Sequence, residues 1–309
     1  MKKPTLRDVA REAGVSVATA SYVLNSVSNQ TIPEDTKKRV YEAAAHLKYV
    51  KNLTAKSLSI GKTNLLGILL IGNDQDLISK RISYGTFIDQ LEQLILAYGY
   101  HLFVARIDPA RPNFNIIQER KLDGVFIVDA SEDSFHQISG QFPYGSPVVL
   151  VDSIIDDPLF QQVVPDYGQL FPLIDGMCGD RSYAILHERW HNDSIAARIR
   201  DISGVPEDRI LAATRQDDAI RSFVERHRGR PLIVFNEFLA LHAAKYANSA
   251  DMIVVCTSGC PDYLPAAARQ VRLETDKAAV AATLMITILT KPYSFDQLDS
   301  KIEFRTGAK

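Results

Sequence analysis

The stretch GVSVATASYVLN, residues 14–25, places its apolar side chains in an unusual way. If it forms a helix entered through a glycine turn, one face carries residues suited to burial: Val15, Ala20, Val23 and Leu24. The opposite face then presents small or apolar residues to solvent: Val17, Ala18, Ser21 and Tyr22. A surface helix usually exposes charged side chains, so we expect this face to meet a partner at close range.

The neighbouring sequence predicts two further short helices. Thr5 and Asp8 form a capping-box pattern before a helical line of apolar residues. Gly14 permits a tight turn, Ser16 can cap the second helix, and Pro33 opens a third. A helix, a Gly-Val-Ser turn and a second helix with small outward residues are typical of a helix-turn-helix, whose second helix lies in the major groove of DNA. We therefore expect an all-α DNA-binding head.

Small outward residues allow a helix to approach base edges closely. We expect Val17 and Ala18 to touch thymine methyl groups, and Tyr22 to offer a ring and a hydroxyl. Short polar side chains suited to phosphate oxygens occur at five positions: Thr5, Ser16, Thr19, Ser21 and Asn25. The alternative is a three-helix bundle that serves only as packing.

Charge separates this head from the rest of the chain. Residues 1–62 contain eleven basic and five acidic side chains, a net of +6, whereas the remaining residues carry a net of −8. A basic head on an acidic body favours contact between the head and a polyanion. The alternative is a basic face that is merely solvated.

Three segments resemble the lactose-repressor (LacI/GalR) family of bacterial transcription regulators: TLRDVAREAGVSVATASYVLN at 5–25, KKRVYEAAAHLKYVKNLTAKSL at 37–58 and GKTNLLGILLI at 61–71. The resemblance implies that the helix-turn-helix domain spans residues 1–50, with base-reading places at Val17, Ala18 and Tyr22. It also implies a hinge at 51–62 that becomes helical on operator DNA and inserts Leu58 into the minor groove. The hinge residues expected there are Asn52, Ala55, Lys56 and Leu58. Lys51 in place of proline and Lys56 in place of arginine depart from the family's pattern.

Residues 63–309 alternate apolar runs with amphipathic ones. Runs such as LLGILLIG, DGVFIVD and PLIVFN are typical of parallel strands buried on both faces. Helical patterns separate several of these runs: 77–98, 131–140, 193–203, 237–249 and 276–290. Repeated strand–helix units predict a doubly wound α/β body in two lobes. The resemblance implies a periplasmic-binding-protein-like pair of lobes that closes on a small molecule, with the first lobe at about 63–152.

The resemblance also suggests effector-binding positions: Asp129, Asp152, Asp166, Arg198 (or Arg200) and Asn236. For each of them a helix cap or an ordinary loop residue is the alternative. Thr257, Ser258 and Gly259 stand where the family commonly has an aspartate. Because a sugar cleft uses carboxylates to hold hydroxyls, we expect weak binding of simple hexoses. The effector would then be a differently functionalised metabolite or a partner protein.

Residues 187–191 read HERWH, a literal His-Glu-x-x-His pattern. On a helix this spacing places two histidines on one face around zinc, with the glutamate as the base of a hydrolase. Here the pattern follows the strand-like run SYAIL, and the next helix signal begins at about Asn192. Histidines at a strand end do not share a face, so we expect no zinc at this motif. For the protein as a whole we expect no metal, no cofactor and no enzymatic activity.

Assembly and location follow from the same reasoning. One short recognition helix makes few base contacts, so we expect a homodimer on a palindromic operator. No run approaches the length of a membrane span, and the N-terminus lacks the apolar core of a signal peptide. The expected protein is a cytoplasmic transcription regulator, most simply a repressor, with no membrane partner.

Overall fold

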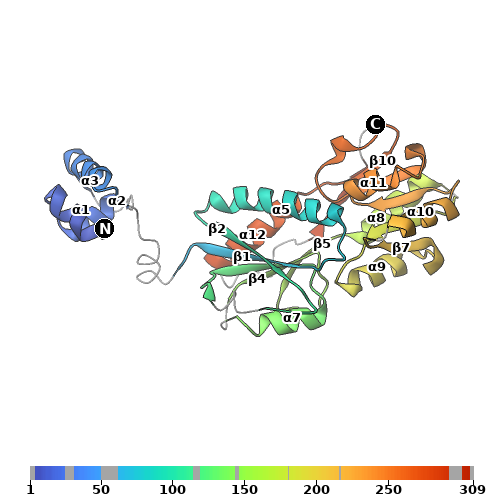
Figure 1. Ribbon diagram of the computed structural model, residues 1–309, viewed down its shortest axis with the longest axis horizontal. Coiled ribbons are helices and arrows are strands. Elements are labelled where there is room, and N and C mark those ends of the chain that lie inside the picture. Colours follow the sequence, from blue (N-terminus) through green and yellow to red (C-terminus); the bar gives the residue numbers. More distant parts are fainter. Residues whose placement is uncertain are drawn as a thin grey trace. The chain divides into compact units, whose positions relative to one another are not determined.

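The chain forms two compact units, Met1–Thr63 and Asn64–Lys309 (Figure 1). The computed structural model describes eight stretches of them: 4–24, 31–49, 62–113, 119–142, 146–179, 181–215, 217–291 and 301–306. Among the helices in these stretches, none has the length and apolar character needed to cross a membrane.

The N-terminal unit contains three helices, α1 (Leu6–Ala13), α2 (Val17–Leu24) and α3 (Glu34–His46). The expected capping box starts α1, since the side chains of Thr5 and Asp8 satisfy each other's backbone N–H groups. Gly14 ends α1 in the left-handed region with φ of 67°. The small core is made by residues from all three helices: Val9, Ala10, Ala13, Ala20, Val23, Leu24, Val40 and Ala43. The predicted helix-turn-helix arrangement is therefore present.

Lobe 1 of the C-terminal unit is built on a parallel sheet with the strand order β11-β5-β4-β3-β1-β2. Its strands are β1 (Leu65–Ile71), β2 (His101–Ile107), β3 (Gly124–Val128), β4 (Val148–Val151), β5 (Gln161–Pro165) and β11 (Lys301–Ile302). Helices α5 (Ile78–Leu96) and α12 (Lys277–Thr290) pack on one face, and α7 (Glu132–Ser139) packs on the other.

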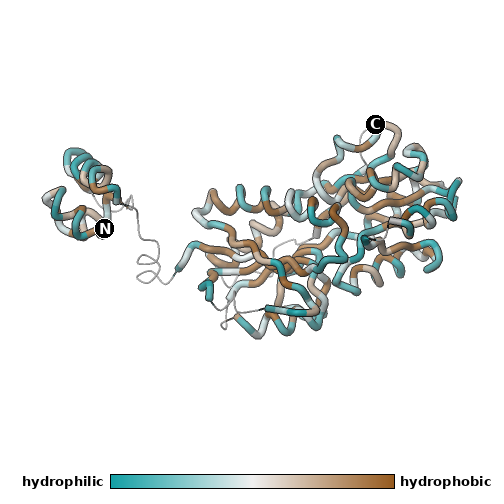
Figure 2. Tube along the Cα trace, viewed as in Figure 1, coloured by the Kyte–Doolittle hydropathy of each residue, from teal (hydrophilic) through white to brown (hydrophobic). Residues whose placement is uncertain are grey.

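Lobe 2 is built on a second six-stranded sheet with the order β12-β10-β9-β8-β6-β7. The parallel strands are β6 (Ala184–Glu188), β7 (Ile210–Ala213), β8 (Leu232–Phe235), β9 (Met252–Cys256) and β10 (Arg269–Leu273). The edge strand β12 (Phe304–Thr306) runs antiparallel to β10. Helices α8 (Tyr167–Cys178) and α9 (Asp193–Ser203) cover one face, while α10 (Asp217–Arg226) and α11 (Glu237–Ala243) cover the other. The central strands of both sheets, β1, β3 and β4 in lobe 1 and β6, β8 and β9 in lobe 2, are buried and form the apolar interior layers seen in Figure 2.

The prediction of a two-lobed, doubly wound α/β body is confirmed, but the expected end of lobe 1 at residue 152 is wrong. Lobe 1 also takes up β5, α12 and β11. Within the described residues the chain passes between the lobes after β5, between β10 and α12, and between β11 and β12. The reason is burial: α12 is apolar along most of its length and completes the layer that α5 begins on the lobe 1 sheet.

Candidate functional site

The outward face of α2 lies open to solvent. Val17 is 43% exposed, Tyr22 is 39% exposed, and Ala18 is exposed as well. The helix contains no charged residue. The three residues expected to read bases therefore share a neutral, close-fitting surface, and their contacts with bases stay a prediction.

Short polar residues begin the first two helices of the head. Thr5 Oγ1 donates to Asp8 Oδ2 at 2.7 Å, and Ser16 Oγ accepts from the Thr19 N–H at 3.0 Å. Both hydroxyls thus sit at helix N-termini, whose partial positive charge suits phosphate oxygens. Ser21 is half-buried within α2. Five expected DNA-contacting residues lie outside the described residues, and their roles stay predictions: Asn25, Asn52, Ala55, Lys56 and Leu58.

The second candidate site lies where the carboxyl ends of the two sheets meet. Asp129, Asp152 and Asn236 directly follow β3, β4 and β8, with φ of 60°, 48° and 86°. Asp and Asn tolerate this left-handed backbone better than most residues, because their short side chains bond locally. The bends place a polar side chain at the carboxyl edge of each sheet, where doubly wound proteins bind ligands.

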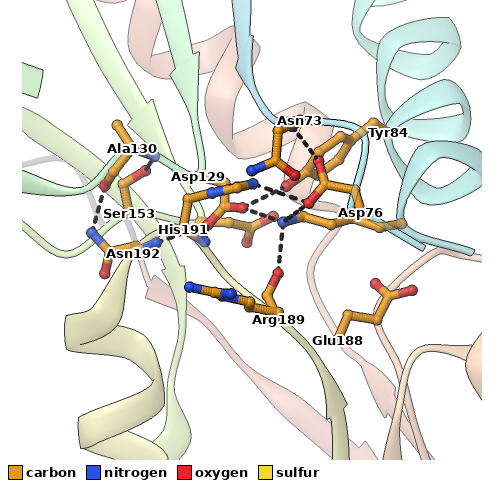
Figure 3. Close-up of polar contacts among 12 residues, drawn as sticks. Asn73, Asp76, Tyr84, Asp129, Ala130, Ser153, Glu188, Arg189, His191 and Asn192 are labelled. Carbon is orange, nitrogen blue, oxygen red and sulfur yellow. Dashed lines mark hydrogen bonds and ion pairs between the residues drawn. The ribbon is translucent and has the colours of Figure 1, made fainter. Parts of the chain in front are cut away.

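Lys80 on α5 contacts a cluster of polar residues at these strand ends, in which Figure 3 labels its partners Asp76, Asp129 and Arg189. Its ammonium lies 2.5 Å from Asp129 Oδ2 and 3.6 Å from Asp76 Oδ1. It also donates to the backbone oxygen of Arg189 at 2.8 Å. Lys80 is 3% exposed and Asp129 is fully buried. A buried ion pair of this kind is stable only while its partners remain hydrogen-bonded to one another.

The same cluster ties lobe 1 to lobe 2. The other oxygen of Asp129 accepts from the backbone N–H groups of His191, at 2.9 Å, and Asn192, at 3.2 Å. The Asn192 side chain donates to the backbone oxygens of Ala130, at 2.6 Å, and Ile154, at 3.1 Å. Asp129 is therefore brought to the cleft, but its oxygens are taken by protein groups.

Burial and these contacts have opposing effects on the pKa values of Asp129 and Asp76. Burial raises the pKa of Asp129, and the Lys80 ammonium opposes that rise without cancelling it. Burial also acts to raise the pKa of Asp76, but the hydrogen bond from His191 and the charges of Lys80 and His191 lower it overall. His191 Nε2 lies 3.0 Å from Asp76 Oδ1. The two shifts differ in direction because Asp129 is fully buried, whereas Asp76 gains a hydrogen bond from His191 and the charges of Lys80 and His191.

Beside the cluster is a small cavity of about 50 Å³. Aromatic and polar side chains of both lobes line it, among them Asp152, Asn236, Tyr167, Trp190 and Phe235. Asp152 pairs with the ammonium of Lys277 at 2.6 Å. Asn236 donates to Glu188 Oε2 at 3.0 Å and to the hydroxyl of Ser83. Two of the expected effector residues, Asp152 and Asn236, thus share one cavity wall.

The remaining expected effector residues lie further from this cavity wall. Asp166 caps α8, because its Oδ1 accepts from the N–H groups of Gly168 and Gln169 at 3.0 and 3.3 Å. Arg198 is exposed on α9. Burial raises the pKa of Tyr167, and the Arg198 guanidinium partly opposes this rise, so its charge is felt at the cavity. Arg200, the alternative arginine, is exposed and lies 3.8 Å from Glu207.

Sequence reasoning missed several residues of the cleft. Lys80 stands in an amphipathic helix where a lysine is ordinarily solvated, so its burial carries no local signal. Glu237, which follows Asn236 directly, is not among the expected effector residues. Its buried carboxylate accepts from the N–H groups of Thr257, Ser258 and Cys260 at 2.9 to 3.0 Å. This carboxylate fixes the loop after β9 in which the family's usual aspartate is absent.

The HERWH pattern behaves as a strand end, as expected. His187 and Glu188 close β6, and α9 begins only at Asp193. The His187 ring stacks on Trp190 with centroids 4.4 Å apart, and its Nδ1 lies 2.8 Å from the Glu188 backbone oxygen. Burial lowers the pKa of His187 to about 4. Across the described stretches, no three His, Cys, Asp or Glu side chains gather as a metal site would require.

Comparison with known proteins agrees with the geometry of the head. Residues 5–52 match the family model described as bacterial regulatory proteins, lacI family. The N-terminal unit is a LacI-family domain. The chain is 34% identical over 131 residues to the HTH-type transcriptional regulator RegA of Clostridium saccharobutylicum, covering 41% of this chain and 37% of RegA. It is 29% identical over 160 residues to the probable HTH-type transcriptional repressor ExuR of Bacillus subtilis, covering 50% of this chain and 44% of ExuR. The chain spans about two fifths of the length of these curated relatives.

Solved structures match nearly the whole chain in fold. The lac repressor dimer bound to operator and the anti-inducer ONPF superimposes with a TM-score of 0.70 at 17% identity, covering 99% of this chain and 98% of that one. The transcriptional regulator CelR in complex with cellobiose gives a TM-score of 0.60 at 17% identity, with the same coverage. At such identities the likeness establishes the fold: a helix-turn-helix head and a two-lobed α/β body.

Proposed function

We propose that this chain is a sequence-specific DNA-binding transcription regulator, acting in the cytoplasm as a repressor and not as an enzyme. The observation that carries the proposal is the exposed, uncharged face of α2 within a LacI-family domain. Small side chains there let the backbone approach base edges, while the basic surroundings attract phosphates. The names of RegA and ExuR, as regulator and repressor, support the same function.

The proposed assembly is a homodimer on a palindromic operator. Residues 1–50 form the DNA-binding domain, 51–62 the hinge and 63–309 the effector-binding and dimerisation domain. The structural neighbour solved as a dimer on operator DNA supports this organisation. Two recognition helices double the number of base contacts, which one eight-residue helix cannot supply alone.

The proposed effector site is the interlobe cleft beside Asp152 and Asn236. A structural neighbour in complex with cellobiose supports a small-molecule ligand. The alternative is control by a partner protein, and one observation favours it: Lys80 and Lys277 already pair with the carboxylates of the cleft, leaving a cavity of about 50 Å³. An effector must therefore reopen the cleft or act elsewhere.

The DNA proposal is tested with the full chain and a pool of random duplexes. Retained fragments are sequenced to define an operator, and affinities are then measured for that operator and for unrelated DNA. Tyr22→Ala should weaken operator binding by about 1–3 kcal/mol and leave binding to unrelated DNA almost unchanged. Tyr22→Phe, which keeps the ring, separates the ring's contribution from the hydroxyl's. Equal losses on both DNAs would refute base reading by Tyr22.

The effector proposal is tested by calorimetry against monosaccharides, sugar phosphates and nucleosides. Simple hexoses should bind weakly, because Ser258 stands where a carboxylate would accept charge-assisted hydrogen bonds. Arg198→Ala should weaken whichever ligand binds. Micromolar binding of an unmodified hexose, unaffected by Arg198→Ala, would show that the site is misplaced.

A further inference from the structure

A second, larger cavity of about 290 Å³ adjoins the first and shares Ser83, Thr257, Leu273 and Lys277 with it, but two of its lining residues, Arg272 and Arg305, have no part in the function proposed above. It is lined by α5, by the loop after β9, by the segment that passes from β10 to α12, and by β12. Both lobes therefore contribute to its wall. Its size is close to the lower end of ordinary small-molecule pockets.

Two arginines stand side by side on the wall of this cavity. Arg272 on β10 and Arg305 on β12 are direct partners in the antiparallel register, and both line the cavity. Like charges directly opposite on neighbouring strands are unfavourable unless something neutralises them. The pair is therefore an unexplained concentration of positive charge in an otherwise ordinary sheet edge.

The protein supplies little neutralisation. The Arg272 guanidinium donates to the neutral Gln270 Oε1 at 2.7 and 2.9 Å, and among the described residues it pairs only with Asp262, 3.9 Å away and 95% exposed. Arg305 pairs with β10 through the backbone of β12, but its guanidinium makes no hydrogen bond or ion pair with any other described residue. The Arg305 guanidinium and the Nη1 group of Arg272 are thus left for a ligand, since Nε and Nη2 of Arg272 both donate to Gln270.

The other charged lining groups are occupied or lie at the solvent edge. Lys277 pairs with Asp152 at 2.6 Å, and Asp276 Oδ1 caps α12 by accepting from the N–H groups of residues 278 and 279. Glu274 is exposed to solvent, where water screens its charge. Hydroxyl groups of Thr257 and Thr275 complete the polar wall. The chemistry left for a ligand is two guanidinium groups with neutral hydroxyls around them.

We propose that this cavity binds a phosphate group carried by a small metabolite, with Arg272 and Arg305 as its two ligands. A guanidinium presents parallel N–H donors that match two oxygens of a phosphate, and a dianion neutralises two like charges at once. The segment from Leu273 to Lys277 crosses between the lobes and forms part of the wall. A phosphate held there is bound by lobe 2, at a wall that lobe 1 helps to form and that adjoins the cavity beside Asp152 and Asn236.

The test uses the full chain, radiolabelled inorganic phosphate and equilibrium dialysis at constant ionic strength set with chloride. Wild-type protein should bind one phosphate per chain in a saturable way. Arg305→Gln should weaken binding at least tenfold, and Arg305→Lys, which keeps the charge but loses the fork, should fall between the two. Arg305 is exposed, so these variants should fold. The matched control is Arg221→Gln, at an exposed arginine on α10 that pairs with Glu225.

Each other outcome would overturn the proposal. Absence of saturable phosphate binding by the wild type refutes the site, and so does binding that survives both Arg305→Gln and Arg272→Gln. An equal loss in Arg221→Gln shows general attraction of phosphate to surface arginines. Since the assay involves no DNA, its result stands apart from the outcome of the operator experiments.

Discussion

Lys80 shows how far a residue's role depends on partners that are distant in sequence. Its ammonium meets Asp129, 49 positions later, and the backbone of Arg189, 109 positions later. The apolar spacing of residues 77–98 predicts the helix on which Lys80 lies, but such spacing contains no information on long-range pairing. The same limit applies to Asp129: its effector role stays a prediction, and its contacts with Lys80 and with the backbone of lobe 2 could not be predicted from the sequence.

Replacement of Lys80 should show how much the stability of the fold depends on its ion pair with Asp129. Lys80→Met leaves the fully buried Asp129 without its cation, so the free energy of unfolding should fall by about 3–5 kcal/mol. Urea denaturation followed by Trp190, the single tryptophan of the chain, measures the change. Adding Asp129→Asn should recover part of the loss, because the two residues form one interaction. A loss no larger than that of the exposed-site control Lys245→Met would contradict the role given to Lys80.

Glu188 should make stability depend on pH. Burial raises its pKa to about 7 from an ordinary 4.5, against the opposing effects of Ser79, Lys80 and Asn236. Between these two values the folded chain holds more protons on this group than the unfolded chain, so this contribution to stability falls as pH rises. From pH 5 to pH 8 the wild type should lose about 2–3 kcal/mol relative to Glu188→Gln. Parallel plots of the free energy of unfolding against pH for the two proteins would refute the raised pKa of Glu188. The lowered pKa of His187 contributes a pH dependence of opposite sign, which is common to both proteins and cancels in the comparison.

At the scale of elements, clear start signals or long apolar spacing predict several helices of the body, α5 among them, but not α8. Asn192 caps α9 and Asp276 caps α12, and both helices begin within one residue of the predicted position. The helix α8 contains Pro172, which removes a backbone hydrogen bond, so the sequence predicts the end of a helix there. Burial of Leu170 and Phe171 outweighs that cost in the folded chain. Local pattern therefore predicts an element only where tertiary packing agrees with it.

The turn between α1 and α2 should tolerate few residues at Gly14. An ideal Cβ there would lie 3.8 Å from Arg39 Nη1, an ordinary contact, so the cost of Gly14→Ala comes from its φ of 67° and is about 1 kcal/mol. Hydrogen exchange of the α1–α3 amides in the full chain should become about fivefold faster. Gly14→Asn should cost less, because asparagine visits the left-handed region more readily. Unchanged exchange in Gly14→Ala would contradict the account of this turn.

At the scale of the whole molecule, the sequence predicted the kinds of domain but not how the lobes are joined. The apolar runs indicated parallel strands, and most of them lie where expected. Assignment of β5, α12 and β11 to lobe 1 depends on which sheet buries them, which the order of elements along the chain does not reveal. For the same reason the cleft cluster could be placed at strand ends, whereas its cross-lobe hydrogen bonds could not be predicted.

Asn192 is the sharpest probe of that cross-lobe connection. Its Nδ2 donates to two carbonyl oxygens of lobe 1, and its Oδ1 caps α9 by accepting from the Ile195 N–H at 3.1 Å. Asn192→Asp keeps the cap but turns both donated bonds into contacts between oxygens, so the closed arrangement of the lobes should lose several kcal/mol. Because Trp190 lines the cleft, its emission should shift to the red and its quenching by acrylamide should increase.

The matched control is Asn248→Asp, where Asn248 caps a short helix through the N–H of residue 250 outside the cleft. This variant should leave the emission of Trp190 unchanged. If Asn192→Asp also leaves it unchanged, the two bonds to Ala130 and Ile154 do not hold the lobes together. If Asn192→Asp does shift the emission, adding Lys80→Met should cause little further shift. The ion pairs of Lys80 and the hydrogen bonds of Asn192 join the same region of lobe 1 to the same region of lobe 2.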